Sequence, residues 1–349
     1  EQGRPVIEAL KKEFPMVKVL LTFFSPSGYE VRKNYKGADY VFYLPWDTSN
    51  NASEFIAATN PTVAIFVKYE FWHHFSTELK SKNIPTISIS SIFRKEQLFF
   101  RKSGGFYRRI LKNFSYFFVQ NKNSVDLLNS IGIYQCTLAG DTRFDRVYTV
   151  VQNGEAIPIA QTFKAHQKTI VVGSCWAEDL EVLTPLINEG KFKFILAPHE
   201  ITETFLRNIE QALQVKSIRY SQVANQSVGD YQVLIIDNVG MLSRLYRYGE
   251  LAFIGGAFGK GLHNILEAAC YGIPIFFGNK SYERFQEARD LIHRGGAFAI
   301  ATEKELKEKL EMVSLPENFL PACEVTRAYV MENLGATDKI MEYCRKLLK

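Results

Sequence analysis

Segments with strand patterns and segments with helix patterns alternate along nearly the whole chain, and this alternation constrains the fold more than any other feature. Short apolar runs between helical periodicities are typical of parallel sheets covered by helices. The expected strands form two series, residues 17–24, 40–44, 62–67, 85–91, 116–120 and 135–139, then 169–173, 192–197, 217–220, 232–237, 251–255, 273–278 and 297–300. We predict an α/β protein with two doubly wound, Rossmann-like domains facing a cleft.

The break between the two series is the turn-rich stretch 153–158, which has no periodicity. A chain of 349 residues is long enough for two domains of ordinary size. We expect them to span residues 1–150 and 151–349, and the last helix could pack back on the first domain. The chain opens with a helical pattern over 5–14, although such domains normally begin with a strand. We therefore expect the first strand of the N-terminal domain to lie upstream of Glu1.

Composition narrows the class of protein. Hydrophobic residues make up 46% of the chain and charged residues 23%, as in folded globular proteins. No apolar run approaches the roughly 18 residues of a membrane span. The five cysteines are scattered without a C-x-x-C pair, which indicates reduced thiols. No Asp-x-Asp pair or cluster with metal-ligand spacing occurs, so we expect neither a metal nor another cofactor.

A glycine-rich turn over 255–261 separates an apolar strand pattern from a helix pattern that begins near His263. Glycines let a backbone approach a ligand closely, and the first turn of a helix offers free N–H groups to a phosphate. Asn264 and Glu267 are spaced to share one helix face, where the carboxylate could accept both hydroxyls of a ribose. The alternative is an ordinary βαβ unit with a glycine-rich surface loop.

Basic residues are concentrated between residues 94 and 112, where they are interleaved with aromatic residues and accompanied by a single acid. Such a segment suits an anionic membrane surface, because basic side chains meet lipid phosphates and aromatic rings enter the headgroup layer. It could instead bind nucleic acid, or be a solvated helix face whose aromatic rings pack inward. We favour the membrane and expect no nucleic acid. The candidate contacts are Arg94, Arg101, Lys102, Arg108 and Arg109.

Several motifs, taken together and in order, resemble the 3-deoxy-D-manno-octulosonic acid (Kdo) transferases of lipopolysaccharide synthesis. They comprise residues 25–28 (SPSG), 43–47 (YLPWD), 70–72 (EFW), 140–145 (GDTRFD), 173–174 (GS), 263–269 (HNILEAA), 272–274 (GIP) and 277–278 (FG). The resemblance implies a GT-B glycosyltransferase at the cytoplasmic face of the inner membrane, with CMP-Kdo as donor and a lipid A precursor as acceptor. The family also carries a membrane-anchoring helix and an Ala-Ser-x-Gly-Glu loop with the proposed base, both expected upstream of Glu1.

The resemblance also implies roles for individual residues. Glu70 and Arg143 would assist the transition state of a direct displacement in which a carboxylate is the base. Arg143 stands where the family commonly has Lys. Alternatively, Glu70 is a carboxylate favoured by a helix N-terminus, and Arg143 forms a salt bridge with Asp141 or Asp145.

The donor-binding residues implied by the resemblance all belong to the second domain. The helix that begins near His263 would stabilise the departing CMP, and Ser174 could bind the carboxylate of the sugar. The full set is Ser174, Pro198, His199, Val239, Gly240, Met241, Asn264, Ile265, Leu266 and Glu267. Two rival interpretations are a nucleotide-sugar epimerase of the same architecture and a non-catalytic nucleotide-binding protein at the membrane surface.

Overall fold

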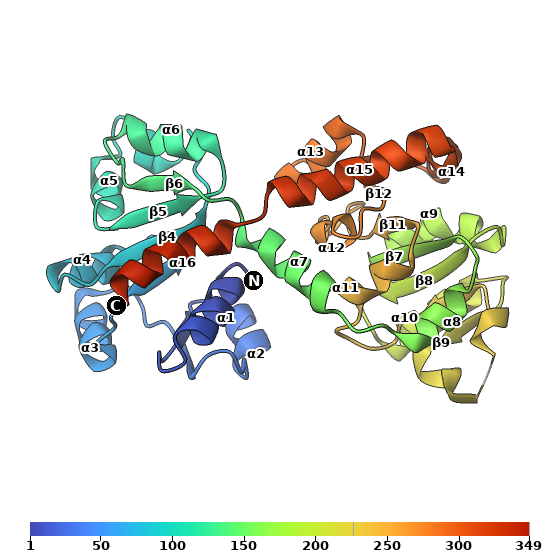
Figure 1. Cartoon of the computed structure of the whole chain (residues 1–349), viewed down its shortest axis with the longest axis horizontal. Coiled ribbons are helices and arrows are strands. Elements are labelled where there is room, and N and C mark those ends of the chain that lie inside the picture. The colour runs from blue at the N-terminus through green and yellow to red at the C-terminus, as the bar shows by residue number, and fades with distance from the viewer. Residues whose placement is uncertain (226, 349) are drawn as a thin grey trace. The chain divides into compact units, whose positions relative to one another are not determined.

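The computed structural model describes residues 1–225 and 227–348. They divide into two compact units, the first made of Glu1–Arg146 with Asn333–Lys349 and the second of Val147–Glu332. Strands occur at the predicted positions in both units, and every strand pair is parallel (Figure 1). The prediction of an α/β fold with two parallel sheets covered by helices is therefore confirmed.

The first unit contains a four-stranded sheet in the order β3-β4-β5-β6 and a separate pair, β1-β2. The predicted N-terminal helix is present as α1. The helices of this unit are α1 (Gly3–Glu13), α2 (Pro26–Arg32), α3 (Ser49–Thr59), α4 (His73–Ser81), α5 (Gly105–Leu111), α6 (Lys122–Ser130), the start of α7 (Thr142–Asn153) and α16 (Ala336–Leu347), with a short 3-10 helix, η1 (Leu98–Phe100). Its strands are β1 (Leu20–Phe23), β2 (Tyr40–Tyr43), β3 (Ala64–Val67), β4 (Thr86–Ser91), β5 (Tyr116–Val119) and β6 (Cys136–Leu138).

The alternation of side chains along β5 divides the core of the first unit into two layers. Phe118 packs with α1 and with α16, which supplies Ile340 and Met341. Phe117 and Val119 face the opposite layer with α5 and α6. The last helix of the chain therefore contributes to the core of the first unit.

The second unit is built on a seven-stranded sheet in the order β13-β12-β11-β7-β8-β10-β9. Its strands are β7 (Thr169–Cys175), β8 (Lys193–Pro198), β9 (Ser217–Arg219), β10 (Val233–Ile235), β11 (Leu251–Ile254), β12 (Ile275–Gly278) and β13 (Ala297–Ile300). Its helices are α8 (Pro158–Lys164), α9 (Ala177–Asn188), α10 (Glu203–Ala212), α11 (Leu242–Leu245), α12 (Leu266–Ala269), α13 (Gln286–Arg294), α14 (Glu303–Ser314) and α15 (Pro316–Glu332), with the 3-10 helices η2 (Tyr220–Asn225), η3 (Val228–Asp230) and η4 (Tyr246–Tyr248).

Strand order reverses at β7 in this sheet, because β8 lies on one side of β7 and β11 on the other. The carboxyl ends of β7 and β11 are therefore a topological switch point, where open α/β sheets bind ligands. Within the described part of the chain, no helix is both long and apolar enough to cross a bilayer.

Candidate functional site

The switch point of the second unit brings the end of β7 against the glycine-rich turn that follows β11. Ser174 has a φ of 53°, a left-handed conformation that is uncommon for a residue with a side chain. A Cβ at Gly255 would collide with the Ser174 carbonyl oxygen, so only glycine allows this close approach. Gly173 is needed for a similar reason, because a Cβ there would collide with the buried Tyr246 hydroxyl.

The glycine-rich turn is closed by its own backbone. Gly261 N donates to the Gly256 carbonyl at 2.8 Å, and His263 N donates to the Gly255 carbonyl at 3.3 Å. Gly256 and Gly261 have φ values of 91° and 115°, which favour glycine. A helix follows the turn, as predicted, but it begins later than near His263. The helix, α12, begins at Leu266 and ends at Ala269, because the Asn264 side chain accepts the Leu266 N–H and holds the preceding residues in a turn.

Asn264 and Glu267 lie next to each other, as their spacing predicted. Asn264 Nδ2 donates to Glu267 Oε1 at 3.2 Å. Both residues are half-buried, whereas the side chains of Ile265 and Leu266 are buried in the core. Ile265 and Leu266 are only 1% and 0% exposed, so neither residue presents accessible surface to a ligand. The one-turn helix carries a smaller dipole than the predicted one, so the polar groups before it gain importance for holding an anion.

Three flat side chains gather beside the glycine-rich turn. The rings of Trp176 and His263 are nearly parallel, with 10° between their planes, and Trp176 Nε1 donates to His263 Nε2 at 2.9 Å. His199 stacks on both, at centroid distances of 4.3 Å from Trp176 and 4.5 Å from His263. The amino group of Lys260 lies 5.6 Å from the centre of a Trp176 ring. Among these residues the sequence predicted only His199 as a contact.

His263 is held in its neutral form by this arrangement. Burial lowers the pKa of the His263 imidazole, and the neighbouring His199 lowers it further. The hydrogen bond from Trp176 also requires an unprotonated Nε2 on His263. His199 is exposed, and its backbone N–H donates to the Cys175 carbonyl at 2.9 Å, which fixes the end of β8 beside β7. His199 therefore presents a solvent-accessible imidazole at the carboxyl edge of the sheet.

Asp179 connects the two loops of the switch point through one oxygen. Its Oδ2 accepts the N–H groups of Trp176 and Gly256, each at 2.9 Å. Oδ1 is buried and has no hydrogen-bond partner. Burial raises the pKa of this carboxyl to about 6. Sequence reasoning missed Asp179 and Trp176. Their three-residue spacing indicates only a capping box at the start of α9, and the structure shows that box.

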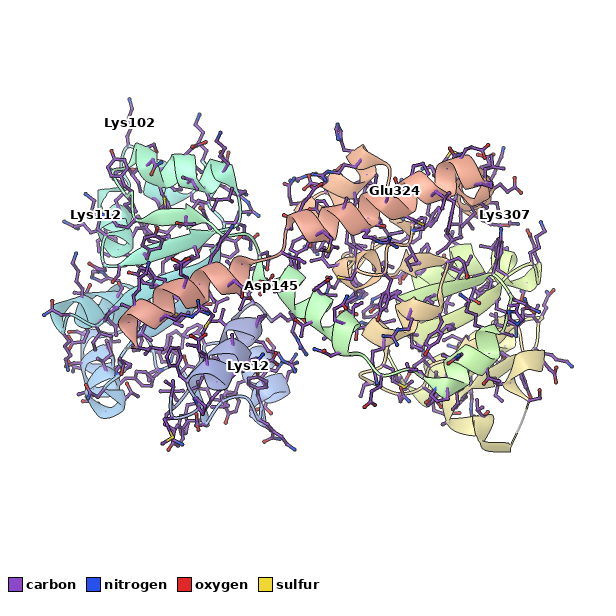
Figure 2. All side chains as sticks on the ribbon, in the orientation of Figure 1. Lys12, Lys102, Lys112, Asp145, Lys307 and Glu324 are labelled. Atoms are coloured by element: carbon purple, nitrogen blue, oxygen red, sulfur yellow. The ribbon has the colours of Figure 1, made fainter. Side chains whose placement is uncertain are left out.

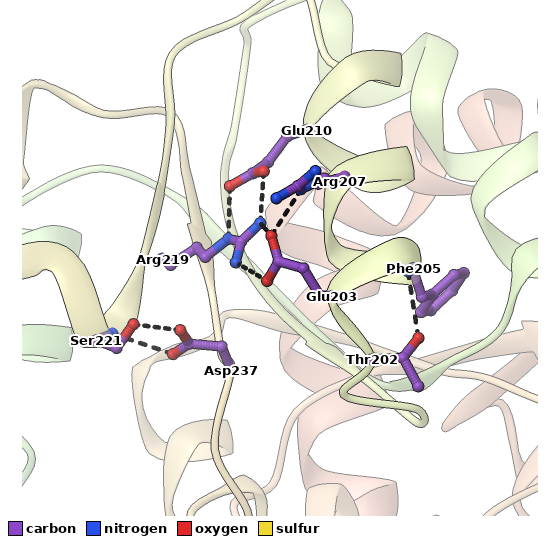
Figure 3. A network of polar contacts seen from close by, with 8 residues as sticks. All are labelled: Thr202, Glu203, Phe205, Arg207, Glu210, Arg219, Ser221 and Asp237. Carbon is purple, nitrogen blue, oxygen red and sulfur yellow. Dashed lines mark hydrogen bonds and ion pairs between the residues drawn. The ribbon is translucent and has the colours of Figure 1, made fainter.

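The loop after β10 forms a further part of this edge. The Asp237 carboxylate accepts hydrogen bonds from the backbone N–H and the hydroxyl of Ser221 (Figure 3). Gly240 has a φ of 91°, and Met241 is the N-terminal cap of α11, so a helix begins here as predicted. Val239 is 86% exposed. This turn is therefore accessible to a ligand, whereas Pro198 is buried.

The edge strand β9 is fastened to α10 by a charged network. Figure 3 shows Arg219 between two carboxylates: Nη1 lies 2.7 Å from Glu203 Oε2, and Nε lies 2.7 Å from Glu210 Oε1. The hydrogen bonds from Arg219 and Arg207 lower the pKa of Glu203 to about 2. The network therefore stays charged near neutral pH and holds the start of α10 close to the loop that carries Ser221.

In the first unit, Glu70 lies just beyond the end of β3, as predicted. Its Oε2 accepts a hydrogen bond from Trp72 Nε1 at 2.6 Å, and its side chain is exposed. The alternative of a carboxylate at a helix N-terminus is wrong for Glu70. That position is taken by Asp47, whose Oδ1 accepts the backbone N–H groups of His74 and Phe75 at 3.0 Å each. The Glu70 carboxylate is therefore not required to cap α4.

Arg143 forms an ion pair with Asp141, which the sequence analysis gave as the alternative to a role in the transition state. Arg143 Nε lies 2.9 Å from Asp141 Oδ2, and Asp141 is buried. The side-chain oxygen of Gln2 accepts hydrogen bonds from Arg143 Nε at 3.3 Å and from Lys68 Nζ at 2.8 Å. Asp145 instead accepts the backbone N–H of Thr337 at the start of α16. Two cations, Arg143 and Lys68, therefore meet around one amide oxygen.

The basic segment 94–112 divides into exposed and structural parts. The guanidinium of Arg108 donates to the backbone carbonyls of Phe99, Arg101 and Lys102, so Arg108 is corrected from a surface contact to a residue that fastens η1 to α5. Phe99 and Phe100 pack against the core. Phe106 and Tyr107 stay exposed, and the labelled Lys102 and Lys112 side chains point outward in Figure 2.

A protein-family model and two curated relatives that match this chain carry the same family description. A protein-family model described as 3-Deoxy-D-manno-octulosonic-acid transferase (kdotransferase) matches residues 1–146. The chain is 26% identical over 320 residues to the 3-deoxy-D-manno-octulosonic acid transferase of Rickettsia bellii, covering 90% of this chain and 76% of the relative. It is 27% identical over 325 residues to the protein of the same name from Aquifex aeolicus. This match covers 90% of this chain and 83% of the relative.

A solved structure with the same fold is UDP-GlcNAc 2-epimerase from Neisseria meningitidis bound to UDP-GlcNAc. The TM-score is 0.68 at 15% identity, and the match covers 99% of this chain and 96% of the epimerase. At this identity the likeness shows the fold alone.

Proposed function

The chain belongs to the 3-deoxy-D-manno-octulosonic-acid transferase family, and from this we propose that it moves Kdo from CMP-Kdo to a lipid A precursor in lipopolysaccharide synthesis. The observation that supports this most directly is the switch point of the second unit. There the Asn264 and Glu267 pair lies beside a glycine-rich turn whose exposed part is Gly259 and Lys260.

The donor would bind with its ribose hydroxyls on the Glu267 carboxylate and its phosphate near the glycine-rich turn. An ionised carboxylate accepts hydrogen bonds and donates none, so it suits a pair of hydroxyls. His199 and the turn that contains Gly240 supply further polar contacts at the same edge of the sheet. Ser174, at the end of β7, could donate its hydroxyl to the sugar carboxylate.

Transfer is a direct displacement at the anomeric carbon. An acceptor hydroxyl loses its proton to a carboxylate, its oxygen attacks the anomeric carbon, and the bond to the phosphate of CMP breaks. Glu70 is an exposed carboxylate at the carboxyl end of a strand and would hydrogen-bond reacting hydroxyls in the first unit. Arg143 and Lys68 would stabilise negative charge there, because their ion pair and amide contacts fix their positions.

The exposed part of the basic segment would hold the protein at the anionic surface where its acceptor resides, at the cytoplasmic face of the inner membrane. Arg94, Arg101, Lys102 and Arg109 are exposed, and Phe106 lies 5.7 Å from the Arg109 guanidinium. Cations with neighbouring exposed rings are the combination that lipid headgroups favour.

The experiment that tests the proposal is a transfer assay with CMP-Kdo and a tetraacylated lipid A precursor. Mass spectrometry should show the acceptor gaining the mass of a Kdo residue, with release of an equal amount of CMP. Omitting the acceptor should abolish CMP release. Conversion of UDP-GlcNAc by the same preparation, with CMP-Kdo left unchanged, would instead identify an epimerase.

A further inference from the structure

Three aromatic side chains gather at the carboxyl ends of the first three strands. Phe24 follows β1, Trp46 lies in the loop after β2, and Trp72 lies in the loop after β3. The centroids of Phe24 and Trp46 are 5.3 Å apart with their rings perpendicular, and those of Phe24 and Trp72 are 4.7 Å apart. We call these three residues the aromatic cluster. Residues far apart in the sequence therefore converge where parallel strands present ligand sites.

Two rings of the aromatic cluster are exposed, whereas Trp72 is half-buried and packs against the core. Trp46 is 74% exposed and Phe24 is 39% exposed, whereas nearby Phe75 on α4 is buried. Leaving a large apolar side chain in water is unfavourable relative to burying it. Exposed apolar side chains that touch one another, at the ligand edge of a fold, indicate a binding surface.

Polar contacts order the loops that carry Trp46 and Trp72 without a ligand. The backbone of Trp46 is fixed through its carbonyl, which accepts from Asn51 Nδ2 at 2.9 Å and from Thr48 N at 2.8 Å. Trp72 is fixed through its ring N–H, which donates to Glu70. A surface that is already ordered loses less entropy when it binds. The Glu70 carboxylate also keeps acceptor capacity beyond this one bond.

We propose that the aromatic cluster and Glu70 together bind a sugar ring of the acceptor, an inference that rests on the proposed transferase function. A sugar ring carries C–H groups on its faces and hydroxyls at its edge. The C–H groups meet the electron-rich face of an aromatic ring, and the hydroxyls donate to the carboxylate. Trp46 thereby determines acceptor affinity, and Glu70 determines the orientation of the ring.

Other occupants fit these groups less well. An acyl chain would cover the rings but would desolvate the Glu70 carboxylate without giving it a hydrogen bond, which is unfavourable. A nucleotide could stack on the rings, but its phosphate would meet the negative charge of Glu70. A neutral polyhydroxylated ring satisfies both the apolar and the acidic part of the surface.

An N-acetylglucosamine disaccharide without long acyl chains or phosphates tests this proposal, because it is neutral and neither membrane affinity nor phosphate contacts contribute to its binding. Saturation-transfer NMR should show its ring protons in contact with the wild-type protein. Trp46→Ala should weaken the affinity at least tenfold, and Trp46→Phe should restore most of it. The matched control is Tyr134→Ala, which removes a ring of the same unit that is 71% exposed but lies outside the cluster.

Circular dichroism should show that Trp46→Ala stays folded, since this side chain contributes little to the core. Equal disaccharide affinity in the wild-type and Trp46→Ala proteins, or no binding at millimolar disaccharide, would overturn the proposal. So would a Trp46→Ala variant that loses affinity for lipid vesicles but not for the disaccharide. CMP binding measured on the same samples separates this proposal from the proposed transferase function. A protein that binds CMP but not the disaccharide would refute the role of the aromatic cluster and leave the donor site intact.

Discussion

Asp179 shows how one buried side chain can organise a binding edge. Its Oδ2 holds the N–H groups of Trp176 and Gly256, and these belong to the loops after β7 and β11. Its other oxygen is buried without a partner, which makes the ionised form costly. A single carboxyl therefore sets the relative position of the two loops on which the proposed donor site is built.

The pH dependence of this carboxyl gives the first prediction. Burial raises its pKa to about 6, so its stabilising contribution is complete below the ordinary value of 3.8 and is lost as the pH rises through about 6. Asp179→Asn keeps an acceptor oxygen for both N–H groups and cannot ionise. Between pH 4 and pH 7, this variant should gain roughly 2–3 kcal/mol of unfolding free energy relative to wild type.

Denaturant unfolding at several pH values measures this difference. Glu311→Gln, which neutralises an exposed carboxylate on α14, is the control and should show no such trend. A constant difference between Asp179→Asn and wild type from pH 4 to pH 7 would show that Asp179 does not titrate in this range.

Glu267 carries the second prediction at this scale. If its carboxylate accepts the ribose hydroxyls, Glu267→Ala should weaken CMP binding by roughly 1.5–3 kcal/mol, the contribution of hydrogen bonds to a charged group. Isothermal titration calorimetry measures the affinity, and Glu311→Ala serves as the control. Unchanged CMP affinity in a folded Glu267→Ala protein would remove Glu267 from the donor site.

At the scale of elements, the segment from η1 to α5 combines two roles that its composition did not separate. Arg108 fastens the segment by donating to three backbone carbonyls, and Phe99 and Phe100 anchor it in the core. Its remaining exposed cations face solvent and can meet an anionic surface, although Arg101 also donates its Nε to the Glu96 carbonyl at 3.0 Å. A structural part and a binding part therefore share one short stretch of chain.

Charge reversal tests the binding part. Replacing Arg94, Arg101, Lys102 and Arg109 with Glu should abolish most binding to phosphatidylglycerol vesicles in a sedimentation assay. Wild-type binding should weaken as salt rises, because exposed charges are screened over about 8 Å at physiological ionic strength. Arg108→Ala should instead lower the melting temperature, since it leaves carbonyl groups without their partner.

The matched control reverses four exposed lysines of the second unit, namely Lys168, Lys191, Lys216 and Lys304. This control changes the net charge equally and should keep vesicle binding. Similar losses in both variants would show that net charge, and not the basic segment, governs association.

At the scale of the whole molecule, features with local signals could be predicted and features made by tertiary contact could not. The strands of both sheets follow from short apolar runs, and the closeness of Asn264 and Glu267 follows from their spacing. The start of α12 was misplaced because an asparagine side chain competes with the helix for a backbone N–H.

The residues that were missed have partners distant in the sequence. Trp176 meets His263 through a ring hydrogen bond, and Asp179 meets Gly256, across contacts that exist only once β7 and β11 are neighbours. Phe24 and Trp46 converge because β1 and β2 are paired, and Trp72 joins them from the loop after β3, which belongs to the other sheet of this unit. Sequence spacing cannot reveal such groups, whereas the order of the strands can.

The measurement that tests the central claim most directly is the equilibrium binding of CMP and UDP to the whole chain by calorimetry. The central claim is that the switch point of the second unit holds the nucleotide of CMP-Kdo. CMP should bind at one site per chain, and Glu267→Ala should weaken that binding, with UDP binding at least tenfold more weakly than CMP. Tighter binding of UDP than of CMP, or no binding of CMP at millimolar concentration, would contradict it.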